Sequence, residues 1–207
     1  MSCTGVILAG GRATRYDGRA KGLERVGGER IIDRVASALR ETTDRLIVIA
    51  NAPQATEWLP GVPAFPDVVA DAGALGGVHA ALHHARDDVL LVAWDMPFVP
   101  AALLAALRAR GEADADLCVP ESAGSGRGVE PLCAWYSARC LPPVAARLAA
   151  GDLRVVSFHA DVRAARLSAA EVARFGDPAL LFSNVNAPED LVAAESRAQS
   201  PTARDRR

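Results

Sequence analysis

Short runs of consecutive apolar residues recur along the first half of the chain. They cover residues 5–9, 46–50 and 89–93. Continuous apolar strands are typical of a parallel sheet covered by helices, because both faces of such strands are buried. The pattern therefore predicts three buried, parallel strands.

Between these runs, apolar residues recur at the spacing of amphipathic helices. The helical positions are Ile31, Ile32, Val35, Ala36 and Leu39, then Leu75, Val78 and Leu82, then Leu103, Leu104 and Leu107. Strands that alternate with helices predict right-handed crossovers in an open sheet. We therefore expect an α/β fold with one domain of three layers (α/β/α) and a Rossmann-like, open, mostly parallel sheet. Ligands of such sheets bind beyond the carboxyl ends of the strands.

The second half of the chain continues this alternation less regularly. Strands are expected at residues 117–119, 132–135 and 155–158, and helices at residues 141–149 and from Pro188 onward. Ser168 and Glu171 have the spacing of a capping box before a short helix. Residues 197–207 are polar and without periodicity, which predicts a disordered tail after a single domain of residues 1–196.

Composition and charge exclude several classes of protein. The net charge of −2 gives no global attraction to nucleic acids or anionic membranes, and no apolar run approaches the ~20 residues of a membrane helix. The amino terminus lacks the basic region of a signal peptide, so we expect a cytoplasmic protein that binds neither nucleic acid nor membrane. The four cysteines form no C-x-x-C pair, which favours reduced, buried thiols over a disulfide or a zinc site.

A glycine-rich segment follows the first predicted strand. It reads Leu8-Ala9-Gly10-Gly11-Arg12-Ala13-Thr14-Arg15, and Gly18 and Lys21 come after it. The glycines permit close approach of the backbone to a ligand, and the amides of Ala9, Gly10 and Gly11 can donate to nucleotide oxygens. Arg15 and Lys21 supply positive charge for a triphosphate. The segment matches neither the Walker A nor the G-x-G-x-x-G pattern, and the alternative is a surface turn with solvated charges.

Acidic and amide side chains stand at the other predicted strand ends. Asp95 follows residues 89–93 and is placed to hold Mg²⁺ beside a triphosphate, unless it caps the helix that follows. Asn51 ends the second strand. Asp67 and Asp71 are competing candidates for a nucleotide contact, or acidic residues that favour a helix amino terminus.

Near the carboxyl end, two asparagines occupy alternate positions. Asn184 and Asn186 would share one face of an extended segment, where either could contact a phosphate or a metal-bound water. The alternative for both is a simple helix entry before Pro188.

Residues 6–23, VILAGGRATRYDGRAKGL, resemble the signature of the molybdenum cofactor guanylyltransferases, the MobA family, whose loop reads LAGG-x-x-x-R-M-G-x-x-K-G-L. Tyr16 stands where methionine is usual. Three later segments are also similar to the family, in the same order. They are the acidic residue Asp67 before the turn at residues 71–77, Asp95-Met96-Pro97, and residues 184–191, NVNAPEDL.

The resemblance implies a fold of the nucleotide-diphospho-sugar transferase type and transfer of GMP from GTP to molybdopterin, with release of pyrophosphate. It implies catalytic roles for Arg15, Lys21 and Asp95, with Mg²⁺ on Asp95, and nucleotide binding by Leu8, Ala9, Gly10, Gly11, Lys21, Asn51, Asp67 and Asp95. Gly18, Asp71, Asn184 and Asn186 are candidates for acceptor or phosphate contacts. Expected protein partners are cofactor-insertion proteins or recipient molybdoenzymes.

Two alternatives to this activity stay open. One is a sister enzyme, either a molybdopterin cytidylyltransferase or a sugar-phosphate nucleotidyltransferase. The other is a non-catalytic nucleotide-binding adaptor, since a fold can outlast its activity.

Overall fold

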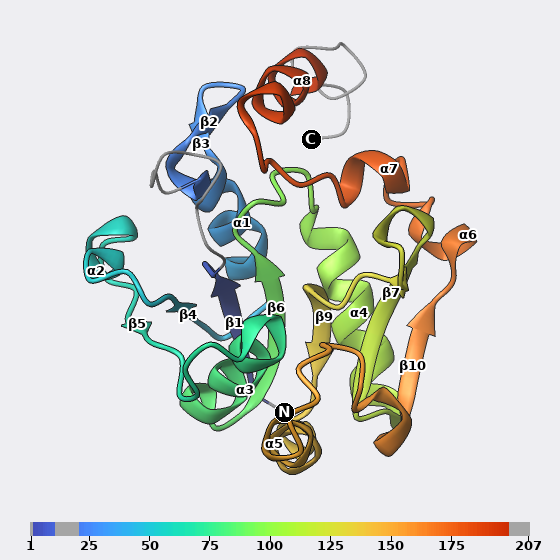
Figure 1. The fold of residues 1–207 in the computed structure, drawn as a ribbon. Helices are drawn as coiled ribbons and strands as arrows, with labels where there is room; N and C mark the ends of the chain where they lie inside the picture. Colours follow the sequence, from blue (N-terminus) through green and yellow to red (C-terminus); the bar gives the residue numbers. More distant parts are fainter. Residues whose placement is uncertain (1, 11–20, 199–207) are drawn as a thin grey trace.

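A twisted central sheet organises the protein, whose computed structural model describes residues 2–10 and 21–198. The strand order is β10-β7-β9-β6-β1-β4-β5, and β8 pairs with β7 (Figure 1). The strands are β1 (Cys3–Leu8), β4 (Arg45–Ile49), β5 (Ala64–Phe65), β6 (Asp88–Ala93), β7 (Leu117–Ser122), β8 (Gly128–Val129), β9 (Cys133–Tyr136) and β10 (Ala164–Leu167). A separate hairpin joins β2 (Arg25–Val26) to β3 (Glu29–Arg30).

Parallel pairing dominates this sheet, as the continuous apolar runs predict. β1 pairs in parallel with β4 and β6, β4 with β5, and β7 with β10. β9 runs antiparallel to both of its neighbours, β6 and β7. Every residue of β1 and β6 is buried. The reversed β9 brings its amino end to the sheet edge where β1, β4 and β6 have their carboxyl ends.

Helices cover both faces of the sheet and make the three predicted layers (Figure 1). The helices are α1 (Ile31–Arg40), α2 (Ala55–Trp58), α3 (Gly73–Ala85), α4 (Ala101–Asp114), α5 (Leu141–Ala149), α6 (Ala169–Val172), α7 (Pro178–Leu181) and α8 (Pro188–Ala198). Cys3 and Ile7 of β1 join the apolar core under α1 and α4, whereas Val6 and Leu8 join the core under α3 and α5. The alternation of side chains along one buried strand therefore supplies both cores.

One predicted strand is wrong. Residues 155–158 form turns, with Ser157 N–H donating to the Arg154 carbonyl at 2.9 Å and His159 N–H to that of Val156 at 3.2 Å. Val155 and Phe158 are nevertheless buried in the core. Their apolar character reflects burial and not an extended backbone, and the strand beside β7 is the more polar β10.

The cysteines and the capping box agree with the sequence-based expectations. All four cysteines are free and buried. Ser168 and Glu171 form a capping box at the start of α6. The last helix begins at Pro188 but extends to Ala198, so the first two residues of the predicted tail are helical. Among the described residues, no helix is both long and apolar enough to span a membrane.

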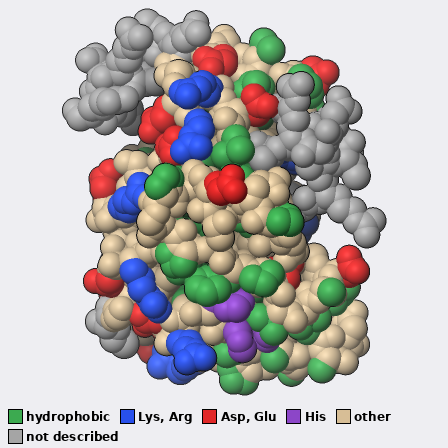
Figure 2. Space-filling model, turned by 90° about the vertical axis from the view of Figure 1, so that its left-hand side faces the viewer, with side chains coloured by type: hydrophobic (Ala, Val, Ile, Leu, Met, Phe, Trp, Pro, Cys, Tyr) green, Lys and Arg blue, Asp and Glu red, His purple; other side chains and the backbone are tan. Residues whose placement is uncertain are grey.

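Histidines of α3 fix the outer strand β5 to the helix. The rings of His84 and Phe65 stack with centroids 4.6 Å apart, and His84 Nε2 lies 3.1 Å from the Pro66 carbonyl oxygen. Figure 2 shows histidine side chains gathered beside hydrophobic ones on this side of the molecule. The stacking on Phe65 and the contact with Pro66 give His84 a packing role.

Candidate active site

The carboxyl ends of β1, β4 and β6 are joined by hydrogen bonds that continue beyond the strands. Ala9 N–H donates to the Ile49 carbonyl at 2.9 Å, and Trp94 N–H donates to the Leu8 carbonyl at 3.1 Å. Leu8 and Ala9 are both buried. These bonds hold together the three strand ends that lead into the predicted site residues Gly10, Asn51 and Asp95.

The bond from Ala9 corrects one sequence-based prediction. The Ala9 amide was expected to donate to the nucleotide, but it is engaged by Ile49 because the parallel ladder extends one residue past β1. Gly10 is exposed, and a methyl group there would meet no atom of the described residues within 4 Å. It therefore keeps the open space that close approach of a ligand requires. Gly11, Arg15 and Gly18 lie outside the described residues.

Asp95 occupies a turn directly after β6. Met96 N–H closes this turn on the Ala93 carbonyl at 3.3 Å. Burial raises the pKa of the Asp95 carboxyl, and the positive charge of Lys21 opposes that rise. The N-cap of α4 is Pro100, with no side-chain hydrogen bond, so Asp95 does not cap this helix. The carboxyl group of Asp95 is thus a partly buried acid beside a lysine, and it does not serve as the helix cap that was its alternative role.

Lys21 reaches a residue from the other end of the chain. Its Nζ donates to Asn186 Oδ1 at 2.8 Å across a separation of 165 residues. Val185 N–H donates to the Asp95 carbonyl at 2.9 Å. The segment before α8 therefore crosses the Asp95 turn, and it brings Lys21, Asp95 and Asn186 together.

The helix entry at α8 depends on a different side chain. Asp190 Oδ2 accepts from the amides of Asn186 and Ala187, both at 2.9 Å. The side chain of Asn186 is therefore not needed to begin α8, and it accepts the hydrogen bond from Lys21 instead. The alternative that Asn186 serves only as a helix entry does not explain this bond. Asn184 is exposed, and Val185 between the two asparagines is buried.

Asn51 and Asp67 bind each other at the ends of β4 and β5. Asn51 Nδ2 donates to Asp67 Oδ2 at 2.8 Å, and Asp67 N–H donates to Asn51 Oδ1 at 2.8 Å. This reciprocal pair fixes Asp67, and not Asp71, beside the strand ends. Asp71 is exposed, with a positive φ of 55°, at the turn before α3.

Gly22 places Lys21 against the Asp95 turn by close packing. A methyl group at Gly22 would lie 2.8 Å from Trp94 Cδ2 and closer still to Cε3. The Trp94 ring is buried and stacks on Trp58 with centroids 5.0 Å apart. The short helix at residues 21–23 can therefore approach Trp94, the neighbour of Asp95, only because residue 22 lacks a side chain.

One acidic residue at this edge was not among the predicted site residues, although the segment Glu130-Pro131 resembles the acceptor-facing part of the family. Glu130, between β8 and β9, is only 7% exposed, and its carboxylate accepts one hydrogen bond from Leu132 N–H at 3.3 Å. Burial raises its pKa, the charge of Asp95 adds to that rise, and Arg127 opposes it. The signal in the sequence was a glutamate enclosed by apolar residues, Val129 before it and Pro131-Leu132-Cys133 after it.

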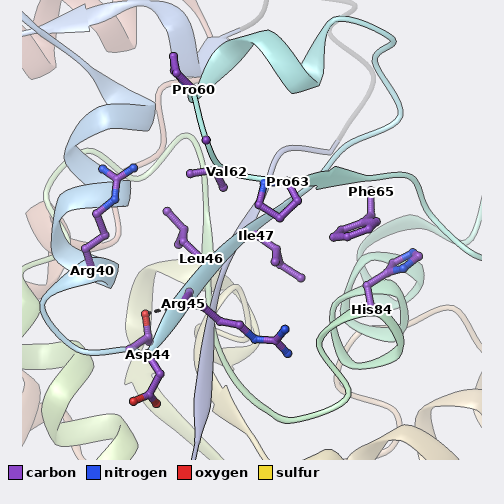
Figure 3. Close-up of a pocket in the computed structure, with 12 residues that line it drawn as sticks. Arg40, Asp44, Arg45, Leu46, Ile47, Pro60, Val62, Pro63, Phe65 and His84 are labelled. Atoms are coloured by element: carbon purple, nitrogen blue, oxygen red, sulfur yellow. Dashed lines mark hydrogen bonds between the residues drawn. The ribbon is translucent and has the colours of Figure 1, made fainter.

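A separate hollow of about 490 Å³ lies along the outer edge of β4 (Figure 3). Its lining includes Arg40, Arg45, Leu46, Val62 and Phe65, and none of the predicted site residues. Arg45 donates from Nε to Thr4 Oγ1 at 2.9 Å, within the sheet. Because none of the predicted site residues lines the hollow, it is distinct from the cluster around Asp95.

The described side chains suit a divalent metal that is bound together with a substrate. Asp95 supplies one carboxylate for such a metal. No set of three or more ligands exists within the described ranges. Mg²⁺ is commonly held by one or two carboxylates, with phosphates and waters completing the octahedron. The donor set fits that arrangement and does not fit a permanent, all-protein metal cage.

Comparison with known proteins gives consistent matches over most of the chain. A family model described as the MobA-like NTP transferase domain matches residues 5–165. A protein of Pelotomaculum thermopropionicum named "Probable molybdenum cofactor guanylyltransferase" is 36% identical over 201 residues, which cover 97% of this chain and 95% of the relative.

Solved structures share the fold. Molybdopterin-guanine dinucleotide biosynthesis protein A from Archaeoglobus fulgidus aligns with a TM-score of 0.78 at 24% identity, covering 94% of this chain and 97% of that one. A Mycobacterium tuberculosis protein, solved in complex with manganese, aligns with a TM-score of 0.57 at 21% identity, covering 88% and 100% of the two chains.

Proposed function

Because this chain belongs to the family of MobA-like NTP transferases, we propose that it transfers GMP from GTP to molybdopterin, with release of pyrophosphate and formation of the guanine dinucleotide cofactor. The observation that supports this most directly is the meeting of Lys21, Asp95 and Asn186 at the strand ends. This edge of an open α/β sheet is where such folds bind their ligands.

The donor nucleotide is proposed to lie over the ends of β1, β4 and β5. The backbone of Gly10 and Gly11 approaches the nucleotide, and the Asn51–Asp67 pair lies beyond it on the same side. Arg15 and Lys21 stabilise the β- and γ-phosphates by charge. Asn186 holds Lys21 in place through the 2.8 Å hydrogen bond.

The metal of this reaction is proposed to be Mg²⁺, held by Asp95. The manganese in the solved Mycobacterium tuberculosis structure belongs to that protein, and it agrees with a divalent metal for this fold. Bound Mg²⁺ would neutralise charge between the α-phosphate and the leaving group. Asp95 is suited to this role because its partly buried carboxylate gains a positive partner when the metal binds.

The chemistry requires positioning more than proton transfer. A phosphate oxygen of molybdopterin attacks the α-phosphorus of GTP, the bond from that phosphorus to the bridging oxygen breaks, and pyrophosphate leaves. The attacking oxygen is already anionic, so no strong general base is needed. Holding two anions in line and neutralising their charge supplies most of the acceleration.

Location and protein partners follow from the substrates. We propose a cytoplasmic location, where GTP is available. Cofactor-insertion proteins or recipient molybdoenzymes are the partners that would take up the product.

Pyrophosphate release tests the proposal. GTP, CTP, ATP and UTP are supplied in turn with Mg²⁺, with and without molybdopterin, to the wild type and to Asp95→Asn. Release that needs both GTP and molybdopterin, and that fails in the variant, is the expected result. Release with CTP would make the protein a cytidylyltransferase, and nucleotide binding without release from any NTP would make it an adaptor.

A further inference from the structure

The sheet topology divides the site into two sides around Asp95. β6, which carries Asp95, lies between β1 and β9. The proposed donor residues follow β1, β4 and β5, on one side. The other side is formed by β9, β7 and β8, and the donor nucleotide has no predicted contact there. The acceptor therefore has to approach over the β9 side.

Glu130 lies on this acceptor side. β9 is antiparallel to β6, with Cys133 opposite Val92, and Ala93 N–H donates to the Leu132 carbonyl at 2.8 Å. Glu130 precedes Leu132 by two residues, so it stands at the same edge as the Asp95 turn. The influence of the Asp95 charge on Glu130 agrees with this proximity.

Among the described residues, Glu130 has few partners for a buried acid. It is 7% exposed, and the hydrogen bond that it accepts from Leu132 N–H is long, at 3.3 Å. A buried carboxylate with so little compensation destabilises the folded protein. Such a group is often retained because a ligand completes its hydrogen bonds. The remaining question is which part of the acceptor carries suitable donors.

The chemistry of molybdopterin leaves one candidate. Its phosphate and its dithiolene sulfurs are anionic, and a buried carboxylate repels them. Its pterin ring carries a 2-amino group next to a ring N–H. Two adjacent donors of this kind match the two oxygens of a carboxylate, as the guanidinium fork does.

We propose that Glu130 binds the pterin edge of the acceptor, with its carboxylate accepting hydrogen bonds from the 2-amino group and the adjacent ring N–H. The proposal rests on the proposed function for the identity of the acceptor. Glu130 acts as a specificity residue: it orients the pterin while the phosphate of the same molecule reaches the Asp95 turn.

The first experiment measures binding without turnover. 6-Hydroxymethylpterin, which has the same amino-oxo edge and no phosphate, is titrated with protein by fluorescence anisotropy. Lumazine, in which an oxo group replaces the 2-amino group, competes. Wild type should bind the pterin and discriminate against lumazine. Glu130→Gln should weaken pterin binding by about ten- to a hundredfold, the range for loss of a charge-assisted bond, and should lose the discrimination.

A matched variant and a stability measurement separate binding from folding. Glu57→Gln removes one charge from an exposed position on α2 and should behave as wild type. Glu130→Gln keeps the side-chain shape and an oxygen that can accept from Leu132 N–H, so its melting temperature should equal or exceed that of wild type. Equal pterin affinity in wild type and Glu130→Gln, or no pterin binding by wild type, would overturn the proposal.

Steady-state kinetics then distinguish this proposal from the proposed function. If wild type turns over, Glu130→Gln should raise the KM for molybdopterin by at least about tenfold and leave the KM for GTP within about twofold. A parallel rise in both KM values would refute a role confined to the acceptor. If wild type releases no pyrophosphate from any NTP, the proposed function fails, while the pterin titration still decides the role of Glu130.

Discussion

Replacing Gly22 by alanine should damage the fold and the site together. The added methyl group would lie 2.8 Å from Trp94 Cδ2, well inside ordinary van der Waals contact. The Trp94 ring has little room to move, since it is 6% exposed and stacked on Trp58. Overpacking of this kind costs about 1–3 kcal/mol. For a chain of this size, that corresponds to a melting temperature lower by roughly 2–12 °C.

The same substitution should also lower activity, because the displaced groups adjoin the site. Lys21 precedes Gly22, and Asp95 follows Trp94. A shift of about 1 Å in catalytic positions costs on the order of a hundredfold in rate. Calorimetry gives the melting temperature of Gly22→Ala, and pyrophosphate release gives kcat/KM for GTP.

Gly10→Ala provides the matched control. A methyl group at Gly10 would meet no atom of the described residues within 4 Å, so the melting temperature should stay within about 1 °C of wild type. The KM for GTP should rise nevertheless, because the methyl group occupies space that the nucleotide needs. In a Trp94→Leu background, Gly22→Ala should lower the melting temperature by less than it does in the wild type, because the clashing ring is absent. Normal stability and activity of Gly22→Ala would show that the contact with Trp94 does not position the site.

Three further measurements test other parts of the structure. Asp95→Asn should reduce kcat by roughly a hundred- to a thousandfold without lowering the melting temperature, since it removes a partly buried charge. Asn186→Ala should raise the KM for GTP by about tenfold through loss of its bond to Lys21, and unchanged kinetics would remove Asn186 from the site. Burial, with a smaller contribution from Arg166, lowers the pKa of His159 from 6.5 to about 4. As the pH falls, the unfolded chain therefore takes up this proton before the folded protein does. The free energy of unfolding should fall by up to about 3 kcal/mol as the pH is lowered from 6.5 to 4. Urea unfolding of His159→Gln should lack that fall.

The parallel half of the sheet could be predicted because burial on both faces leaves a continuous apolar run. β1, β4 and β6 carry this signature, and the structure places them where the runs begin and end within a residue or two. β10 could not be predicted in this way, because it is an edge strand of which only Leu167 is buried. An edge strand needs few apolar residues. A turn that packs into the core, such as residues 155–158, can contain more apolar residues than such a strand.

The contacts among the predicted site residues could not be predicted from the sequence. The sequence identified Lys21, Asp95 and Asn186 as separate candidates, but a hydrogen bond across 165 residues follows only from the tertiary fold. The hydrogen bonds between Asn51 and Asp67 likewise depend on the pairing of β4 with β5. Local sequence patterns identify residue types at strand ends, whereas the pairing of those ends depends on strand order.

The reversed strand β9 explains why strand-end reasoning gave Glu130 no role. In a parallel sheet, functional residues are sought after strands, and Glu130 comes before one. An antiparallel neighbour turns its amino end toward the carboxyl ends of β6 and β1, so residues that precede it join the same edge. The reversal also gives the site its two unlike sides. The donor side depends on backbone amides and positive charge, which suit phosphates, and the acceptor side presents a buried carboxylate, which suits N–H donors. This difference would oppose entry of GTP in the reverse orientation, because its triphosphate would then meet Glu130.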